Sequence, residues 1–369
     1  MTDMPLLPVL RVEGSHRDVG LQIGAVCIDA IRDAVSFSHG EVPLDGRTWA
    51  EQFVLAGEYR TFTAQRLPYI VEELDAVAEA ADVDPVRLFA ASVEEIWDWE
   101  EPEVATERIR LAAERGRCSD LVVGGPATAT GSVLVAHNND LDESDEANMV
   151  AIDWNVEGEP QMFTAGIGPW ISVGWNAAGL LLSGNELAPN DNRVGIPRLL
   201  MVREQLRQTS MRTAVDAALN PDRASSYNTV YATPDGQVAN IEGSATNAEI
   251  TGLNESGFMV HTNHYVCESM LRYEDDHEYA ERSARRYNRG SELLAQAAEQ
   301  GLPVTAGVLK SMLSDHENAP DSLCRHPDSS TTTKTVFWCV TDVASGHITF
   351  GRGNPCTSVP QTFQFPNAA

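Results

Sequence analysis

The chain has 369 residues, of which 43% are hydrophobic, and its formal net charge at pH 7 is −28. This length and apolar content suffice for a large folded core and argue against a disordered protein. The negative charge repels phosphate backbones and anionic lipids, so we expect no nucleic-acid partner and no membrane-surface partner. Acidic runs such as DESDE at 142–146 are spread along the chain and indicate a solvated surface.

The amino-terminal stretch MTDMPLLPVLRVEG lacks a basic segment followed by an apolar one. No run approaches the ~20 apolar residues that cross a bilayer, so we expect a soluble, cytoplasmic protein. The cysteines form no C-x-x-C pair, which argues against a zinc ribbon, a thioredoxin motif and a disulfide framework. We therefore expect free thiols at these positions: 27, 118, 267, 324, 339 and 356.

Residues 14 to about 116 are predicted to be mainly helical. Apolar residues recur at helical spacing over 14–37, and the pattern returns over 67–84 with Pro68 near its start. A further helix is expected over 84–100, where Asp84 is a candidate N-cap and Pro85 occupies the first turn.

From Cys118 onward, short apolar runs separated by turn residues predict strands. Further helical patterns occur at about 196–218, 268–300 and 304–314. Hairpins with helices in separate blocks favour antiparallel sheets packed against helices over a parallel βαβ fold. The expected strands lie within 121–125, 132–139, 170–176, 179–186, 228–233, 237–243, 257–265, 333–342 and 346–353.

Metal and nucleotide motifs are weak in this sequence. His261 and His264 in HTNH are three residues apart, and on a strand such residues point to opposite faces. No H-E-x-x-H, P-loop, G-x-G-x-x-G or G-x-S-x-G motif occurs. We therefore predict no metal site and no cofactor.

Cys118 in ERGRCSDLVVGG stands where the helical pattern gives way to the β pattern. A catalytic thiol needs a base to accept its proton, and no local pattern selects one of the nine histidines. The spacing alone leaves two interpretations open, an inert thiol and a catalytic nucleophile.

The order of several motifs resembles the acyl-coenzyme A:6-aminopenicillanic acid acyltransferase family, a branch of the N-terminal nucleophile (Ntn) hydrolases. The likeness covers roughly residues 10–356. It rests on VEGSHRDVGLQIG, LPYIVEELDAVAEAADVD, RCSD, HNND, HTNH and TVFWCVTD…GRGNPC. The resemblance implies an α+β fold of the αββα type, a four-layer sandwich of two antiparallel sheets flanked by helices.

The family's precursors cleave themselves immediately before the nucleophile, which places the cut between Arg117 and Cys118. Residues 1–117 would form a helical α fragment and residues 118–369 a catalytic β fragment, and the two would stay associated. The thiol would attack the carbonyl of Arg117, and water would cleave the resulting ester. The freed α-amine has an ordinary pKa of about 7.7–8.0 and can then act as the general base.

The resemblance also assigns roles to other positions. Asp140 in HNND would orient the nucleophile, although an Asx turn at a strand end is an alternative interpretation. Asn263 would donate to the oxyanion, and Asn185 in SGNEL matches a second polar oxyanion group more weakly. His261 and His264 would be supporting hydrogen-bonding residues, with His264 at the substrate.

Three positions differ from the family pattern. Arg117 stands where Gly is frequent, and Asp120 stands where Ser or Thr is frequent. At the family's active-site Arg, this sequence has Thr333-Lys334. Lys334 is our candidate for binding substrate there, with Arg325 and Arg352 as alternatives.

The expected activity is formation of a thioester on Cys118 from a small N-acyl amide or an acyl thioester. The acyl group then passes to water or to an amine, as in an amidohydrolase or an acyltransferase. A β-alanyl-amine hydrolase is an alternative within this class. A non-catalytic binding protein, or a precursor that never matures, is the alternative from another class.

Overall fold

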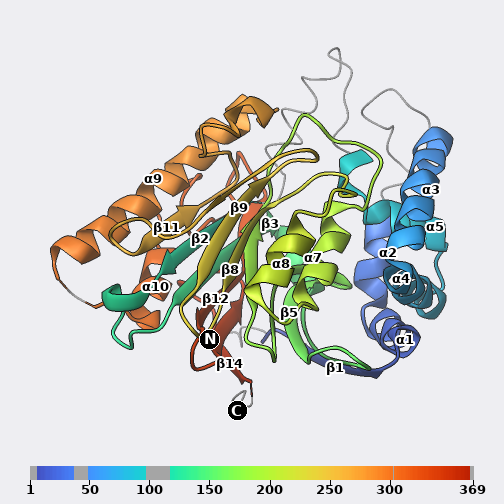
Figure 1. Cartoon of the computed structure of the whole chain (residues 1–369), viewed down its shortest axis with the longest axis horizontal. Coiled ribbons are helices and arrows are strands. Elements are labelled where there is room, and N and C mark those ends of the chain that lie inside the picture. Colours follow the sequence, from blue (N-terminus) through green and yellow to red (C-terminus); the bar gives the residue numbers. More distant parts are fainter. Residues whose placement is uncertain (1–5, 37–48, 97–116, 302, 366–369) are drawn as a thin grey trace.

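The computed structural model describes residues 6–36, 49–96, 117–301 and 303–365. In this part of the chain, two β-sheets pack face to face and helices cover their outer sides (Figure 1). Among the described residues, no helix combines the length and the apolarity needed to cross a membrane.

The larger sheet has eight strands, and all neighbours in it are antiparallel except β1 and β4, which run parallel. In sheet order they are β1 (Val9–Gly14), β4 (Met149–Val156), β5 (Met162–Ile167), β6 (Trp170–Asn176), β7 (Leu181–Asn185), β8 (Asn228–Ala232), β9 (Val238–Gly243) and β10 (Ala248–Thr251).

The smaller sheet has six antiparallel strands. In sheet order they are β11 (Phe258–His261), β2 (Arg117–Val123), β3 (Leu134–Asp142), β12 (Thr333–Asp342), β13 (His347–Arg352) and β14 (Gln361–Gln364). Strand β2, which carries Cys118, therefore lies inside the sheet, between β11 and β3.

Three apolar cores hold the four layers together. One core lies between the large sheet and helices that include α1 (His16–Val26), α4 (Pro68–Ala81), α7 (Arg198–Leu206) and α8 (Met211–Ala218). The second fills the space between the sheets and includes Phe163, Trp175 and Phe337. The third lies between the small sheet and two helices, α9 (His277–Glu299) and α10 (Ala306–Leu313). Burying each large apolar side chain contributes roughly 1.5–3 kcal/mol.

The αββα sandwich predicted from the resemblance is confirmed by these layers. The helices of the amino-terminal segment also include α2 (Ile28–Ser36), α3 (Trp49–Arg66) and α5 (Pro85–Ala91). Pro68 occupies the first turn of α4, and the Asp84 side chain accepts from Val86 N and Arg87 N as an N-cap. Residues 97–100 of the expected helix lie outside the described residues.

Some elements differ from the sequence expectation. β1 belongs to the predicted helical fragment but extends the large sheet at its edge beside β4, and β1, β4, β5, β10 and β14 had not been predicted. The run at 257–265 is a strand only to His261, because Asn263 N donates to Ser283 Oγ at 2.7 Å and the chain turns toward α9. The helix expected from 268 begins at His277, behind the Asp276 N-cap.

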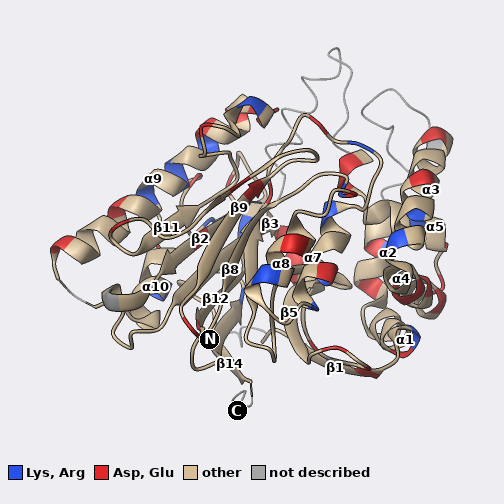
Figure 2. Cartoon of the chain, viewed as in Figure 1, with Lys and Arg blue, Asp and Glu red and all other residues tan. Residues whose placement is uncertain are grey.

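Charge is distributed unevenly over the helices (Figure 2). Acidic residues outnumber basic ones on α2 and α4, whereas α9 carries a run of arginines. Two of these, Arg282 and Arg286, are directed toward the start of β2, where they meet buried carboxylates. The arginines of α9 thus compensate acidic charge close to Cys118.

Candidate active site

Cys118 is the second residue of β2, and its register partner on β3 is Asn139. Because side chains alternate along a strand, Cys118 and Asp120 share one face of the sheet. Asp120 Oδ1 accepts from Ser183 Oγ of β7 at 2.5 Å, which shows that this face looks toward the large sheet. The thiol therefore lies between the two sheets.

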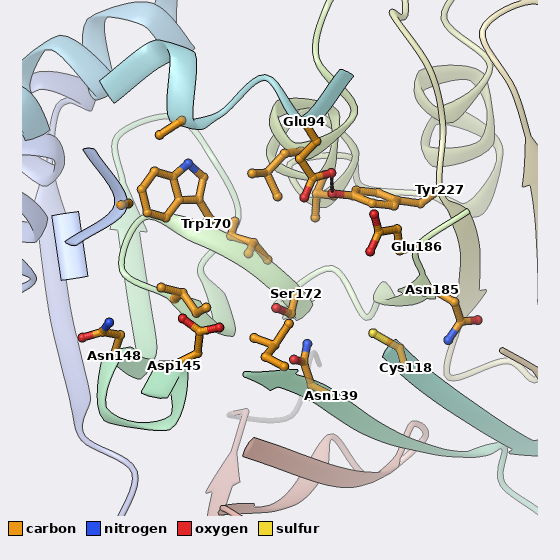
Figure 3. A pocket seen from close by; sticks show the side chains of 18 of the residues that line it. Glu94, Cys118, Asn139, Asp145, Asn148, Trp170, Ser172, Asn185, Glu186 and Tyr227 are labelled. Carbon is orange, nitrogen blue, oxygen red and sulfur yellow. Dashed lines mark hydrogen bonds between the residues drawn. The ribbon is translucent and has the colours of Figure 1, made fainter. Parts of the chain in front are cut away.

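A cavity of about 580 Å³ opens at the thiol. Its apolar wall includes Trp170 and Leu182, and Cys118, Asn139 and Asn185 lie together at one end (Figure 3). The acidic residues that line it are Asp33, Glu94, Asp145 and Glu186, and no Lys, Arg or His belongs to the described lining. Such a cavity suits a small, partly apolar molecule that is neutral or positively charged.

The backbone on both sides of Cys118 is held by side chains. Cys118 N donates to Asn263 Oδ1 at 2.7 Å, and Cys118 O accepts from Arg286 Nη1 at 2.6 Å. Arg286 Nη2 also donates to Asn263 Oδ1 at 2.8 Å. The Asn263 Nδ2 group donates to Glu186 O at 3.0 Å, so in the intact chain Asn263 orients the Cys118 amide.

Arg286 is fully buried because α9 packs closely on the small sheet. Ser283, Arg286 and Gly290 lie on one buried helix face, as expected for spacings of three and four residues. A Cβ at Gly290 would come within 2.8 Å of a Leu121 methyl group and 3.1 Å of a Val260 methyl group. The glycine thereby allows the close approach that brings Arg286 to β2.

Asp140 is the register partner of Arg117, so it lies beside the Arg117–Cys118 peptide bond. Its Oδ1 accepts from Thr335 Oγ1 at 2.6 Å, and its Oδ2 lies 4.0 Å from Arg286 Nη1. Oδ2 has no hydrogen-bond partner among the described residues. Burial raises the pKa of this carboxyl group, while the charges of Arg286 and Arg325 oppose the rise.

The Cys118 thiol has a pKa well above the usual range. Burial is the main cause, and the carboxylates of Asp140 and Asp120 add to it, while Arg286 opposes them. A thiol in these surroundings is protonated at neutral pH and is a weak nucleophile. The thiol of the intact chain is therefore poorly reactive toward an external substrate.

The Asp120 carboxylate contacts two other buried side chains, those of His137 and Ser183. Its Oδ1 is 3.0 Å from His137 Nδ1 as well as bonded to Ser183. All three side chains are buried, which ties β2 and β3 of the small sheet to β7 of the large one. Asp120 therefore has partners that explain its burial, and its negative charge also raises the pKa of the Cys118 thiol.

Asn185 lines the cavity close to Cys118. Its Oδ1 accepts from Asn228 Nδ2 at 3.2 Å and lies 2.9 Å from His261 Nδ1. His261 Nε2 is 3.0 Å from Glu242 Oε1, so His261 is held between the two residues and helps to fix the orientation of the Asn185 amide. Asn185 Nδ2 is buried without a hydrogen-bond partner among the described residues.

Lys334 and His264 lie outside the cavity lining. Lys334 forms an ion pair with Glu146, and Arg352 lies 3.9 Å from the same carboxylate. His264 contacts Ser283 Oγ, and burial together with the charges of His261 and Arg286 lowers its pKa to about 4. These positions do not bring Lys334 or His264 to the thiol.

Arg286 is a candidate functional residue that the sequence motifs did not indicate, since they pointed to Lys334, Arg325 and Arg352 instead. The signal available was an arginine between Ser283 and Gly290 on the apolar face of a predicted helix. A charged residue on such a face is buried only with a partner. The partners, Asn263 and Asp140, come from distant parts of the chain.

Arg117 has a binding site of its own. Its Nη1 donates to Asp321 Oδ1 at 2.9 Å, and its guanidinium lies over the Tyr279 ring at 5.2 Å. Asp321 also pairs with Arg282, Arg285 and Arg325. A bulky residue is therefore accommodated directly before Cys118.

Comparison with known families gave one match. The model of the acyl-coenzyme A:6-aminopenicillanic acid acyltransferase family matches residues 127–356, more than half of the chain. The matched region contains Asp140, Asn185 and Asn263 and begins after Cys118. No curated protein matched the sequence.

Solved structures with a similar arrangement include an N-acylethanolamine-hydrolyzing acid amidase ortholog from Caenorhabditis elegans. It shares 17% identity, with 62% of this chain and 93% of that chain covered and a TM-score of 0.41. Two variants of the conjugated bile acid hydrolase from Clostridium perfringens share 11% and 14% identity, with TM-scores of 0.45 and 0.39. They cover 68% of this chain and 98% and 97% of their own.

Proposed function

The chain belongs to the acyl-coenzyme A:6-aminopenicillanic acid acyltransferase family, and we propose that it is a self-cleaving amide hydrolase or acyltransferase with Cys118 as its nucleophile. The observation that carries the proposal is the Cys118 thiol at one end of a cavity that also contains the unpaired amide donor of Asn185. A nucleophile and an oxyanion donor beside a substrate-sized cavity are the parts that acyl transfer needs.

The first step is self-cleavage. The Cys118 sulfur attacks the carbonyl carbon of Arg117, and the peptide C–N bond between Arg117 and Cys118 breaks. The Cys118 nitrogen takes the proton that the thiol loses and becomes an amine. Water then hydrolyses the thioester to give the Arg117 carboxylate and a free thiol. Two contacts support this step: Asn263 Oδ1 holds the nitrogen that becomes the amine, and Asp321 anchors the Arg117 side chain.

Cleavage changes the electrostatics of the thiol. The new α-ammonium group would lie beside Asp140, whose Oδ2 has no other hydrogen-bond partner among the described residues. Its positive charge opposes the carboxylates that raise the thiol pKa in the intact chain. When neutral, the same amine can accept the thiol proton. Cleavage would thus convert a protected cysteine into a reactive one.

Turnover follows the same chemistry on an external acyl group. The thiolate attacks the substrate carbonyl, and Asn185 Nδ2 donates to the oxygen that becomes negative. The leaving amine takes a proton from the α-ammonium group, and the acyl group remains on sulfur. Attack by water gives hydrolysis, whereas attack by an amine gives transfer.

The cavity favours a substrate with an apolar part and a neutral or cationic part. Arg198 forms ion pairs with Glu94 and Glu186, with nitrogen–oxygen distances of 2.7 and 3.0 Å. Asp33 and Asp145 have no cationic side chain beside them in the described lining. This charge favours a β-aminoacyl amide or another amide with an ammonium group. It disfavours anions such as penicillin carboxylates and the phosphates of acyl-coenzyme A.

Mass spectrometry of the purified chain tests the proposal. Wild type should appear as two fragments, one ending at Arg117 and one beginning at Cys118, and Cys118→Ala should remain intact. Cys267→Ser is the matched control, because this partly buried thiol lies outside the cavity lining, and it should cleave as wild type does. An uncleaved wild type whose Cys118 also resists alkylation would favour the binding-protein alternative.

A further inference from the structure

Four potential metal ligands converge at one end of the small sheet, and none of them lines the cavity at Cys118. They are His316, which follows α10, Cys324 and His326, which precede β12, and Cys356, which follows β13. One ligand atom from each lies within 4.8 Å of the others. Cys324 is buried and the other three are exposed, so the group is accessible to an ion from solution.

Four of the six separations between these ligand atoms are close to those around a single tetrahedral metal ion. With usual zinc bond lengths, ligand atoms of a tetrahedron lie about 3.8 Å apart for two sulfurs, about 3.6 Å for sulfur and nitrogen, and about 3.3 Å for two nitrogens. Here the two sulfurs are 3.6 Å apart, and His326 Nε2 lies 3.6 and 3.4 Å from Cys324 and Cys356. His316 Nε2 and His326 Nε2 are 3.1 Å apart.

A further contact orients one of the ligands. Asn354 Nδ2 donates to Cys324 Sγ at 3.4 Å, and hydrogen bonds of this kind hold metal-bound thiolates in place.

We propose that His316, Cys324, His326 and Cys356 bind one zinc ion in a closed structural site. Two thiolates and two imidazoles are the ligand set of many structural zinc sites, and four protein ligands leave no position for a substrate. The spacing of these residues along the chain contains no C-x-x-C pair, which is why the sequence motifs did not indicate the site.

The position of this Cys2His2 cluster suggests what the zinc ion would stabilise. Cys324 and His326 flank Arg325, whose backbone is bonded in both directions to Thr335, the residue that donates to Asp140. The same loop carries Asp321, which holds the Arg117 side chain. The ion would therefore fix the loop that supports the Arg117–Cys118 bond.

Metal analysis of the full chain tests the inference. Protein reduced with a phosphine, loaded with Zn²⁺ and desalted should retain about one zinc ion per chain. Loading with Co²⁺ instead should give the intense visible bands of a tetrahedral ion and a thiolate charge-transfer band. Cys356→Ala and His316→Ala change exposed residues, and each should weaken zinc binding at least about 100-fold in competition with a chelator.

Two control variants distinguish zinc bound at the cluster from zinc bound elsewhere on the chain. Cys267→Ser should bind zinc as wild type does, and Cys118→Ala should too, because neither residue belongs to the cluster. Circular dichroism establishes that each variant is folded. Failure of the reduced wild type to bind either ion, or unchanged binding by a folded Cys356→Ala variant, would overturn the proposal. The proposal would also be overturned if the isolated protein contained a disulfide between Cys324 and Cys356 and still bound no metal after that disulfide was reduced.

Discussion

Replacement of Arg286 by Met tests the electrostatics around Cys118. The guanidinium donates to Cys118 O, Ser119 Oγ and Asn263 Oδ1, and it lies 4.0 Å from Asp140 Oδ2. Methionine keeps much of the volume but removes the charge and all the donors. Arg286→Lys is the matched variant, because it keeps the charge and loses the planar fork.

The expected cost follows from these distances. Two unit charges 4.0 Å apart attract by about 4 kcal/mol at an effective dielectric constant of 20. Breaking a buried ion pair by removing one partner typically destabilises by about 3–5 kcal/mol. We therefore expect Arg286→Met to lower the free energy of unfolding by about 3–5 kcal/mol, with a smaller loss for Arg286→Lys.

The destabilisation should also depend on pH. Without Arg286, the already raised pKa of Asp140 rises further, since burial is its main cause and a compensating cation is gone. Because the pKa of this carboxyl group is higher in the folded state than in the unfolded state, the folded protein is favoured when the group is protonated. The free energy of unfolding therefore falls as the pH increases. The difference between wild type and Arg286→Met should be larger at about pH 8 than at about pH 5.

Urea unfolding of the uncleaved Cys118→Ala background measures these free energies, and a time course of cleavage in the Cys118 protein measures the effect on reactivity. The thiol pKa should rise when Arg286 is removed, so cleavage should slow by at least about tenfold, one pKa unit, at neutral pH. Arg286→Met with wild-type stability and a wild-type cleavage rate would refute the proposed role of this arginine.

The other predictions concern turnover, pH and helix packing. In steady-state kinetics, Asn185→Ala should lower kcat by about 10²–10³-fold with little change in KM. A rise in KM as large as the fall in kcat would argue against an oxyanion role. Burial and the charges of Asp142 and Asp33 raise the pKa of Asp145 to about 6. Asp145 thus loses its negative charge as pH falls through about 6, and KM for a cationic substrate should rise there; Asp145→Asn should show no such pH dependence. Gly290→Val should lower the free energy of unfolding by about 1–3 kcal/mol, as measured by thermal or urea unfolding. The valine Cβ would come within 2.8 Å of Leu121 and would push away α9, which carries Arg286. Unchanged stability would contradict that packing.

The fold was largely predictable because its strands are bounded by strong turn signals. The expected runs at 170–176 and 333–342 coincide with β6 and β12. Strand β1 was not predictable in this way, because its six residues pair in parallel with β4 from a distant segment, and such pairing leaves no local signal.

The candidate site was predictable only in part, for a similar reason. Cys118, Asp140, Asn185 and Asn263 were recognised through short motifs and their order. Arg286 and the Cys2His2 cluster depend on contacts between segments that are distant along the chain, and neither forms a local motif. Arg286, which opposes the rise in the pKa of the Cys118 thiol, was therefore visible only in the folded structure.

The proposed mechanism depends on Cys118 carrying the acyl group once its amine is free. The mass of the catalytic fragment shows this after the cleaved enzyme has reacted with a p-nitrophenyl acyl ester and been quenched in acid. We expect a fragment that begins at Cys118, one added acyl group located on that residue by peptide mapping, and a matching burst of phenolate. An acyl group on another residue, or a burst retained by Cys118→Ala, would contradict the mechanism.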